Sequence, residues 1–366
     1  MRRQVSQWLV VVALASFLGG AAARADTAEV DTAIDSAFAW LTSERDDLGA
    51  WRSEYGPGIT GLVATAYLRH PSGRYDGDSP ELKAALDWLA SLQQEDGSIY
   101  DPDSQLPLPN YNPSTALMAL SAAKSNSYAD VVRRAQDYLM MSQTDEGDGA
   151  SPEDSNYGGI GYGSDPDVRD LSNLTFALAA LQESGVPEDA AVWGKAVQFL
   201  ERVQNNSETN DQSYASDDGG FIYSPGESKA DVDSQGRPRS YSSMTYAGLL
   251  SFIYANVSKD DARVQAAHKW LQEHWSMDEN YPIGQQGLYY GYHTMAKALS
   301  AYGDDTITTS DGETIRWYDA LASHLLSLQT PDGFWPPNDA DRWYEGDPVL
   351  VTAYSLLALE AGYPAP

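Results

Sequence analysis

The residues of this chain best suited to acid–base chemistry lie just before two apolar runs and inside a third. Asp170 precedes LSNLTFALAA, Asp347 precedes PVLVTAYSLL, and His293 lies within GYHTMAKALS. Two carboxylates across a cleft can act as general acid and base on a glycosidic bond. A histidine at a cavity rim can hold a ligand by hydrogen bonds. These three residues are the catalytic candidates. They are far apart in the sequence, so the sequence alone does not show whether any two of them face each other. Further acids occur in a loop, at Asp217, Asp218 and Glu227.

Tyrosines offer a second kind of chemistry, because a phenol has a flat apolar face and a hydrogen-bonding hydroxyl. The chain has 23 tyrosines and 7 phenylalanines, which predicts many rings at a wet boundary rather than in a dry centre. Such rings around a concave site suit sugar faces or an amphipathic small molecule. The predicted ligand-binding residues are Tyr162, Tyr223, Tyr241, Tyr290, Tyr292, His293 and Trp335.

Residue types disfavour several other chemistries. The chain contains no cysteine, so it has no thiol nucleophile and no thiolate metal site. A site of His293 with Asp231 or Asp233 is conceivable, but so few scattered ligands rarely define a metal. The run DVDSQG (231–236) begins like a calcium loop, but its twelfth position is Ser242 instead of glutamate. The sequence therefore predicts neither a metal nor a cofactor.

The first 25 residues have the composition of an export signal. Arg2 and Arg3 precede the apolar run WLVVVALASFLGG, and Ala23-Arg24-Ala25 offers a small-x-small cleavage site. The apolar run is too short to cross a bilayer comfortably. The sequence predicts a signal peptide over 1–25 and export to the periplasm, the cell surface or the medium.

The net charge is strongly negative. It is −30 for the whole chain, and removal of residues 1–25, which hold three arginines and no acid, changes it to −33. Such a surface repels phosphate backbones and anionic headgroups. Nucleic acid and bare membrane are therefore disfavoured as partners, no transmembrane anchor is predicted, and a small molecule or a glycan is the expected ligand.

The elements that must position these residues are repeated along the chain. The run SLQTPDGFW (327–335) follows a helical pattern and holds a glutamine, then a glycine four positions on, then a tryptophan. Amphipathic helical patterns precede every copy of this unit, and alanine-rich ones follow it. Five weaker copies occur at 41–51, 86–100, 138–149, 199–206 and 270–281.

The repeated turn has a structural explanation. Its glycine supplies the left-handed backbone that ends a helix, and its glutamine amide can satisfy the carbonyls freed there. Two weaker copies keep the spacing from glutamine to glycine, as Gln93 to Gly97 and Gln143 to Gly147. The turn is thus predicted to be a clasp between an outer and an inner helix.

Six helix pairs can form an open solenoid or a closed ring. Neither terminal repeat has the polar character of a cap, which favours closure. The alanine-rich second helices suit a crowded inner ring, and each begins near a threonine: Thr60, Thr115, Thr175, Thr245, Thr294 and Thr352. We predict an all-α fold, a double barrel of about six helix pairs in one domain over 26–366, with loop insertions near 144–170 and 205–241.

These repeats resemble the α/α-toroid of squalene-hopene cyclases and prenyltransferase β-subunits. Gln329, Gly333 and Trp335 match the cyclases' glutamine–tryptophan motif, and the resemblance covers essentially the whole mature chain. The resemblance implies the fold rather than one activity, because a fold hosts many chemistries. His293 followed by Thr294 is similar to the prenyltransferases' zinc-binding segment, but the cysteine of that zinc site is absent.

The resemblance also identifies what is missing. Cyclases of this group protonate an alkene with a DxDDT motif, whereas the five residues ending at Thr175 are LSNLT. Asp165, Asp167 and Asp170 lie upstream and could supply a displaced acid. We therefore expect a divergent toroid that binds a small molecule or a glycan at its mouth. A glycan-acting hydrolase or lyase, a terpenoid cyclase or transferase with a displaced acid, and a protein-docking scaffold remain alternatives.

Overall fold

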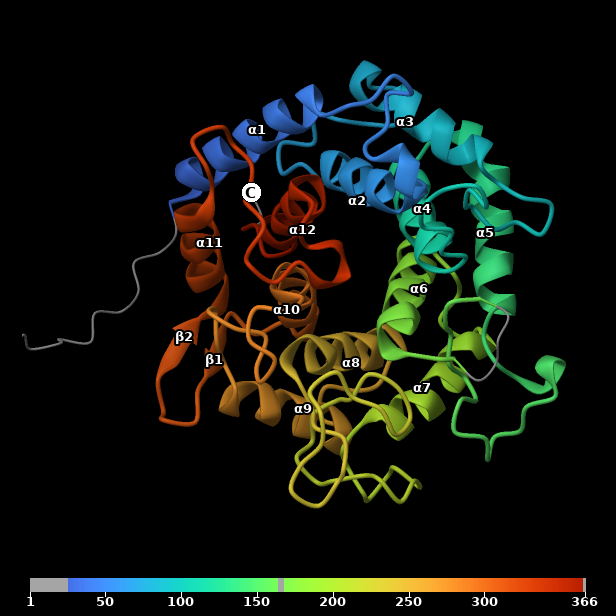
Figure 1. The fold of residues 1–366 in the computed structure, drawn as a ribbon, viewed down its shortest axis with the longest axis vertical. Coiled ribbons are helices and arrows are strands. Elements are labelled where there is room, and N and C mark those ends of the chain that lie inside the picture. Colours follow the sequence, from blue (N-terminus) through green and yellow to red (C-terminus); the bar gives the residue numbers. More distant parts are fainter. Residues whose placement is uncertain (1–25, 164–167, 365–366) are drawn as a thin grey trace, which may run out of the picture.

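A computed structural model describes residues 26–163 and 168–364, and the predicted signal peptide over 1–25 lies outside them. Within the described residues the chain forms twelve α-helices and one short β-hairpin. Six helices make an inner ring and the other six surround it (Figure 1). The predicted α/α toroid is confirmed. Across the same residues, no helix has the length and apolar character needed to cross a bilayer.

The odd-numbered helices form the outer ring: α1 (Thr27–Ser43), α3 (Pro80–Ser91), α5 (Ala129–Met141), α7 (Ala191–Val203), α9 (Ala262–Glu273) and α11 (Trp317–Leu328). The even-numbered helices form the inner ring: α2 (Pro57–Leu68), α4 (Tyr111–Ala122), α6 (Leu171–Glu183), α8 (Ser242–Tyr254), α10 (Leu288–Tyr302) and α12 (Pro348–Ala361). An antiparallel hairpin between α10 and α11 was not expected from the sequence; it pairs β1 (Thr306–Thr308) with β2 (Thr314–Arg316).

Contacts between the first and last helices close the ring. Each inner helix packs against the next one along the chain, and α12 packs against α2. The outer ring closes in the same way, because α1 packs against α11. The described chain is therefore a closed toroid rather than an open solenoid.

Burial explains which helices lie inside. In the inner helix α6 every residue from Leu171 to Leu181 is buried, so its whole circumference is covered. The outer helix α5 buries only Ala135 and Leu139. A helix that is apolar all round is stable only when it is surrounded, and small alanine side chains allow six such helices to approach one another.

The longest connections lie on one side of the toroid. Each outer helix runs into the following inner helix at the side where the inner helices begin. The connections from α5 to α6 and from α7 to α8 include the two long loops, over 142–170 and 204–241. Loop residues therefore gather at the mouth formed by the N-terminal turns of the inner helices.

Glutamine side chains join consecutive outer helices. Nε2 of Gln329 donates to the carbonyl of Ala33 in α1 at 2.8 Å and to the carbonyl of Gly333 in its own turn at 2.7 Å. Three other glutamines also donate both to a glycine of their own turn and to a carbonyl near the start of the next outer helix. The pairs to the next helix are Gln93–Val131, Gln143–Val192 and Gln204–Arg263.

This pattern corrects our expectation that the amide satisfies carbonyls of its own helix. The clasp instead fixes the spacing between neighbouring repeats. Gln143 also bonds to the carbonyl of Gly158 and not to Gly147, which lies exposed in a short 3-10 helix over Glu146–Asp148. A Cβ on Gly158 would lie 1.8 Å from the carbonyl oxygen of Lys195. Only glycine allows that approach. Because the loop insertion places Gly158 fifteen residues after Gln143, a search for a glycine four positions after the glutamine does not find it.

The aromatic residue of the turn is buried beneath it. The indole N–H of Trp335 donates to the carbonyl of Leu325 at 2.8 Å, and its backbone N–H donates to Oγ1 of Thr352 at 3.1 Å. The threonine near the start of this inner helix is thus bonded to the turn that precedes it. The first repeat has the same bonds among Trp51, Leu41 and Thr60.

We expect Gln329→Ala to destabilise the protein by about 2 kcal/mol, because it leaves two carbonyls without their donor and loosens the closure between α11 and α1. Thermal unfolding should show a fall in Tm of roughly 2–4 °C. Gln105→Ala, which replaces an exposed glutamine, is the control and should leave Tm within about 1 °C. Equal melting temperatures for Gln329→Ala and the native protein would show that the clasp adds no stability.

Candidate ligand-binding site

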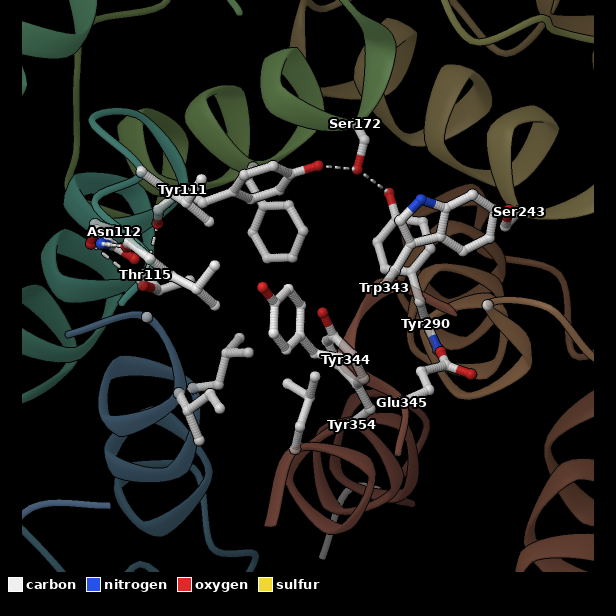
Figure 2. A pocket seen from close by; sticks show the side chains of 18 of the residues that line it. Tyr111, Asn112, Thr115, Ser172, Ser243, Tyr290, Trp343, Tyr344, Glu345 and Tyr354 are labelled. Atoms are coloured by element: carbon white, nitrogen blue, oxygen red, sulfur yellow. Dashed lines mark hydrogen bonds between the residues drawn. The ribbon is translucent and has the colours of Figure 1, made fainter. Parts of the chain in front are cut away.

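A pocket opens where the first turns of all six inner helices converge. It encloses about 250 Å³, and Figure 2 shows side chains from the surrounding helices pointing into it. Ten of its 23 lining residues are aromatic: Tyr55, Tyr111, Tyr162, Phe176, Tyr223, Tyr241, Tyr290, Trp343, Tyr344 and Tyr354. Six are aliphatic: Ile59, Leu62, Leu106, Leu108, Met244 and Leu350. The polar side chains are Asn112, Thr115, Ser172, Ser243 and Glu345, and Gly58 and Gly287 complete the lining.

A chain of hydroxyls crosses one wall of the pocket. The hydroxyl of Tyr111 donates to Oγ of Ser172 at 2.6 Å, and that hydroxyl in turn donates to the hydroxyl of Tyr290 at 3.1 Å (Figure 2). These bonds link α4, α6 and α10. Phe176 packs edge-on against Tyr111 and stacked against Tyr290, with ring centroids 5.2 and 6.1 Å apart. The wall is therefore held in one arrangement by its own side chains.

The turn before α12 carries two half-exposed rings at the pocket's rim. Trp343 and Tyr344 are 40 and 48% exposed and have φ values of 58° and 65°. Bulky residues rarely adopt positive φ, and the conformation costs on the order of 1–3 kcal/mol for each residue. The energetic cost indicates that surrounding contacts hold these rings in place.

Glu345 anchors this turn. Its side chain is buried and accepts the backbone N–H of Tyr290 at 2.8 Å and of Tyr289 at 3.3 Å, in the first turn of α10. Burial raises the pKa of Glu345 to about 7, and hydrogen bonds from these backbone N–H groups oppose the rise. Glu345 is the one acid among the described lining residues. Sequence reasoning missed it, because RWYEGD (342–347) has no periodicity and matches no motif.

Asp170 lies directly behind the pocket wall. It caps α6, accepting the backbone N–H of Asn173 at 2.9 Å and its side-chain amide at 2.8 Å. Burial raises its pKa to about 6, and hydrogen bonds from Asn173 and Tyr223 oppose this. The hydroxyl of Tyr223 lies 3.1 Å from that of Tyr162 at the rim. Asp165 and Asp167 lie outside the described residues.

Of the predicted ligand-binding residues, four line the pocket: Tyr162, Tyr223, Tyr241 and Tyr290. The other three lie elsewhere. Tyr292 directs its hydroxyl to the carbonyl of Met277 and to His324 on an outer helix. Trp335 is fully buried in the clasp. His293 is buried below the pocket, with its ring against Phe176 and Tyr354.

The remaining acid candidates have structural partners. Asp347 caps α12 through the backbone N–H of Val349 and pairs with Arg52 at 2.8 Å. The loop acids bond within their own segment: Asp217 to Ser207, Asp218 to Gly220 and Ser240, and Glu227 to Lys229. Among the described residues these acids and Asp347 do not line the pocket.

The described residues contain no group of three or more histidines and acids that could hold a metal ion. The suggested calcium-like run is a turn in which Asp233 accepts the backbone N–H of Gln235 and pairs with Arg237. His293, the histidine of the conceivable metal site, is enclosed by inner-ring aromatic residues. These contacts offer no metal a set of ligands.

An ion cluster lies at the other end of the inner ring. Glu183 accepts from Nζ of Lys297 at 3.0 Å and from Arg69. Burial opposes ionisation of Glu183, but the charges of Lys297 and Arg69 outweigh it and lower the pKa to about 2. Burial, reinforced by the same two cations, holds the pKa of His293 well below its usual value. The cluster was not predicted, because its members come from α6, α10 and the C-terminal end of α2, which are far apart in the sequence.

Comparison with known proteins establishes the fold and no more. The sequence matches no protein-family profile and no curated protein. A protein from Actinoplanes has a TM-score of 0.55 at 16% identity, over 93% of this chain and 100% of that one. The apo type II terpene cyclase MstE from Scytonema has a TM-score of 0.57 at 14% identity, over 92% and 98%. A variant of a glycosidase has a TM-score of 0.52 at 16% identity, over 92% and 98%. The chain is thus similar in fold to toroids of two enzyme classes.

Asp170 and Glu345 each contribute stability that declines as the pH rises from about 4 to about 7. Folding raises the pKa of Asp170 from 3.8 to about 6 and that of Glu345 from 4.5 to about 7. Their stabilisation is complete below the unfolded values and is lost as the pH rises through the folded ones. Glu183 has the opposite shift, so its contribution is lost between about pH 4.5 and 2. The lowered pKa of His293 acts in the other direction, because its contribution to stability is lost as the pH falls below the unfolded value of 6.5.

Urea unfolding at a series of pH values measures this effect. Glu345→Gln should flatten the decline between pH 4.5 and 7 by on the order of 2–3 kcal/mol. Glu313→Gln, at an exposed site on the hairpin, serves as the control and should keep the native profile. Parallel curves for Glu345→Gln and the native protein would show that Glu345 ionises in the fold as it does in the unfolded chain.

Proposed function

We propose that this protein binds a small, largely apolar organic molecule in the aromatic pocket at the mouth of its inner ring. The observation that carries the proposal is the lining itself, in which 16 of 23 residues are aromatic or aliphatic and five have polar side chains. Binding sites for small molecules combine such apolar walls with a few polar groups that fix orientation. We further propose, from residues 1–25, that the protein is exported.

A neighbouring toroid supports an apolar ligand. One structure of the terpene cyclase MstE contains geranylgeranyl dihydroxybenzoate as substrate, a molecule with a long hydrocarbon part. In the present chain, Tyr344 and Tyr354 point their hydroxyls toward the space between the rings (Figure 2). These hydroxyls suit a ligand that carries one or two polar groups on an apolar body.

Cyclisation by alkene protonation is the less favoured function. That reaction needs a carboxylic acid made unusually strong by its surroundings. Burial acts in the opposite direction on Asp170 and Glu345, because it raises the pKa of both and makes them weaker acids. Glu345 also directs its oxygens at backbone N–H groups of α10.

Glycoside hydrolysis has less support as well. It requires two carboxyl groups on opposite sides of the bond that breaks. Glu345 is the single carboxyl among the described lining residues, and Asp170 lies behind Tyr162 and Tyr223. The eight tyrosines of the lining could still hold a glycan by their ring faces and hydroxyls, but such binding alone breaks no bond.

The proposal is tested with the neutral fluorescent probe N-phenyl-1-naphthylamine. The protein should increase its fluorescence in a saturable manner, and Trp343→Gly should weaken binding by about 5- to 10-fold through the loss of an aromatic wall. Because glycine adopts positive φ without strain, this variant should keep the native Tm or exceed it. Loss of binding is thereby separated from loss of fold.

Leu48→Gly is the matched control, since it removes an exposed apolar side chain outside the pocket. It should leave probe affinity unchanged. Absence of saturable binding to the native protein would refute the proposal, and so would equal affinities for Trp343→Gly and Leu48→Gly.

A further inference from the structure

Aromatic rings make up much of the described lining of the pocket, and basic side chains are absent from it. The face of an aromatic ring is the negative side of its quadrupole, and ten rings line this pocket. None of the described lining residues is lysine, arginine or histidine. A neutral molecule fits such walls, but a cation gains a further attraction to them.

Two buried acids at this mouth have uncharged partners. Glu345 accepts backbone N–H groups of α10, and Asp170 accepts from Asn173. By contrast, Glu183 at the opposite end of the ring has charged partners, since it pairs with both Lys297 and Arg69. Buried carboxylates are normally paired with positive charge. The mouth therefore has negative charge that a positive ligand would balance.

The charge of Asp170 extends across the pocket. Five tyrosines of the lining have raised pKa values. Burial is the main cause, and the negative charge of Asp170 raises the pKa of every one of them further. They are Tyr111, Tyr162, Tyr223, Tyr241 and Tyr290. A cation placed among these rings would lie in the same field and be stabilised by it.

Rings at the rim already hold cations of the protein itself. Nζ of Lys229 lies 4.2 Å from the ring centroid of Tyr223, and the guanidinium of Arg342 lies 4.4 Å from that of Trp343. Both distances are within the range of a cation–π contact. The rings of this rim are thus able to accept positive groups.

Two sources of positive potential oppose a cation: the N-termini of the inner helices, which carry partial positive charge, and the side chains of Lys229 and Arg342 beside the rim rings. Acid side chains lie at three of these ends, Asp170 at α6, Glu345 at α10 and Asp347 at α12. The acids offset part of the helix field. Comparing a cation with an anion of similar shape therefore tests whether the acids and rings outweigh the positive helix N-termini.

We propose that the ligand of this pocket is an organic cation, with an ammonium group on an apolar body, held against the ring faces by cation–π contacts and by the charge of Asp170 and Glu345. This inference rests on the proposed function, because it specifies the chemical class of the molecule bound at the same site.

Three probes of one shape test the charge: choline, its neutral carbon isostere 3,3-dimethylbutan-1-ol, and the anion 3,3-dimethylbutyrate. Each is titrated at pH 8 and 0.15 M salt against protein that holds N-phenyl-1-naphthylamine. Choline should displace the dye at a concentration about 10-fold lower than the alcohol, and the butyrate should be the weakest. Equal displacement by choline and the alcohol, or strongest displacement by the butyrate, would overturn the inference while the proposed function stands. If the native protein does not bind the dye at all, both the proposed function and this inference are wrong.

Charge-matched variants separate the pocket from the acidic surface. Asp170→Asn keeps a good helix cap and should weaken choline about 3- to 10-fold without changing the alcohol. Asp261→Asn removes the same charge from the cap of the outer helix α9, which does not line the pocket, and should leave both probes unchanged. A fold check by Tm accompanies each variant. Equal losses of choline affinity in the two variants would assign its binding to general surface charge and contradict the inference.

Discussion

One interaction, the pair of hydrogen bonds donated by a glutamine amide, sets the geometry on which the toroid depends. In four turns this amide joins a glycine carbonyl of its own turn to a carbonyl of the next outer helix, as Gln329 does with Gly333 and Ala33. A side-chain amide has two N–H donors, so one residue can satisfy both carbonyls. Because the second carbonyl belongs to the next repeat, the bond fixes the offset between repeats, and the last such bond closes the circle.

Closure in turn creates the pocket. Every inner helix begins at the same side of the ring, so six N-terminal turns converge on one space that no two repeats could enclose by themselves. Orphan N–H groups at these turns require acceptors, and Asp170 and Glu345 supply them for α6 and α10. The same acids lose their water in doing so, which raises their pKa values. The same two side chains, Asp170 and Glu345, therefore cap the inner helices and supply negative charge beside the pocket.

The sequence predicted the repeats, and hence the toroid, because the clasp is local and recurs. The site was predicted only in part, because it depends on helical phase and on ring closure. Tyr290 and Tyr292 are about 200° apart on α10, so one faces the pocket and the other faces His324. His293 shares a face with Tyr290 but lies one turn deeper. Phe176 has no distinguishing pattern, and the turn that carries Glu345 is held at the pocket by bonds to α10, far away in the sequence.

The rim turn supports a binding role more directly than any motif. Trp343 and Tyr344 hold positive φ with exposed rings, so their conformation costs folding energy and burial of their own side chains returns little of it. Glycine at either position would remove the strain. The cost is sustained because the Glu345 side chain is bonded to α10 one residue later, and its result is two flat faces beside a cavity. A molecule bound in the pocket against these two rings would bury them and recover part of that energy.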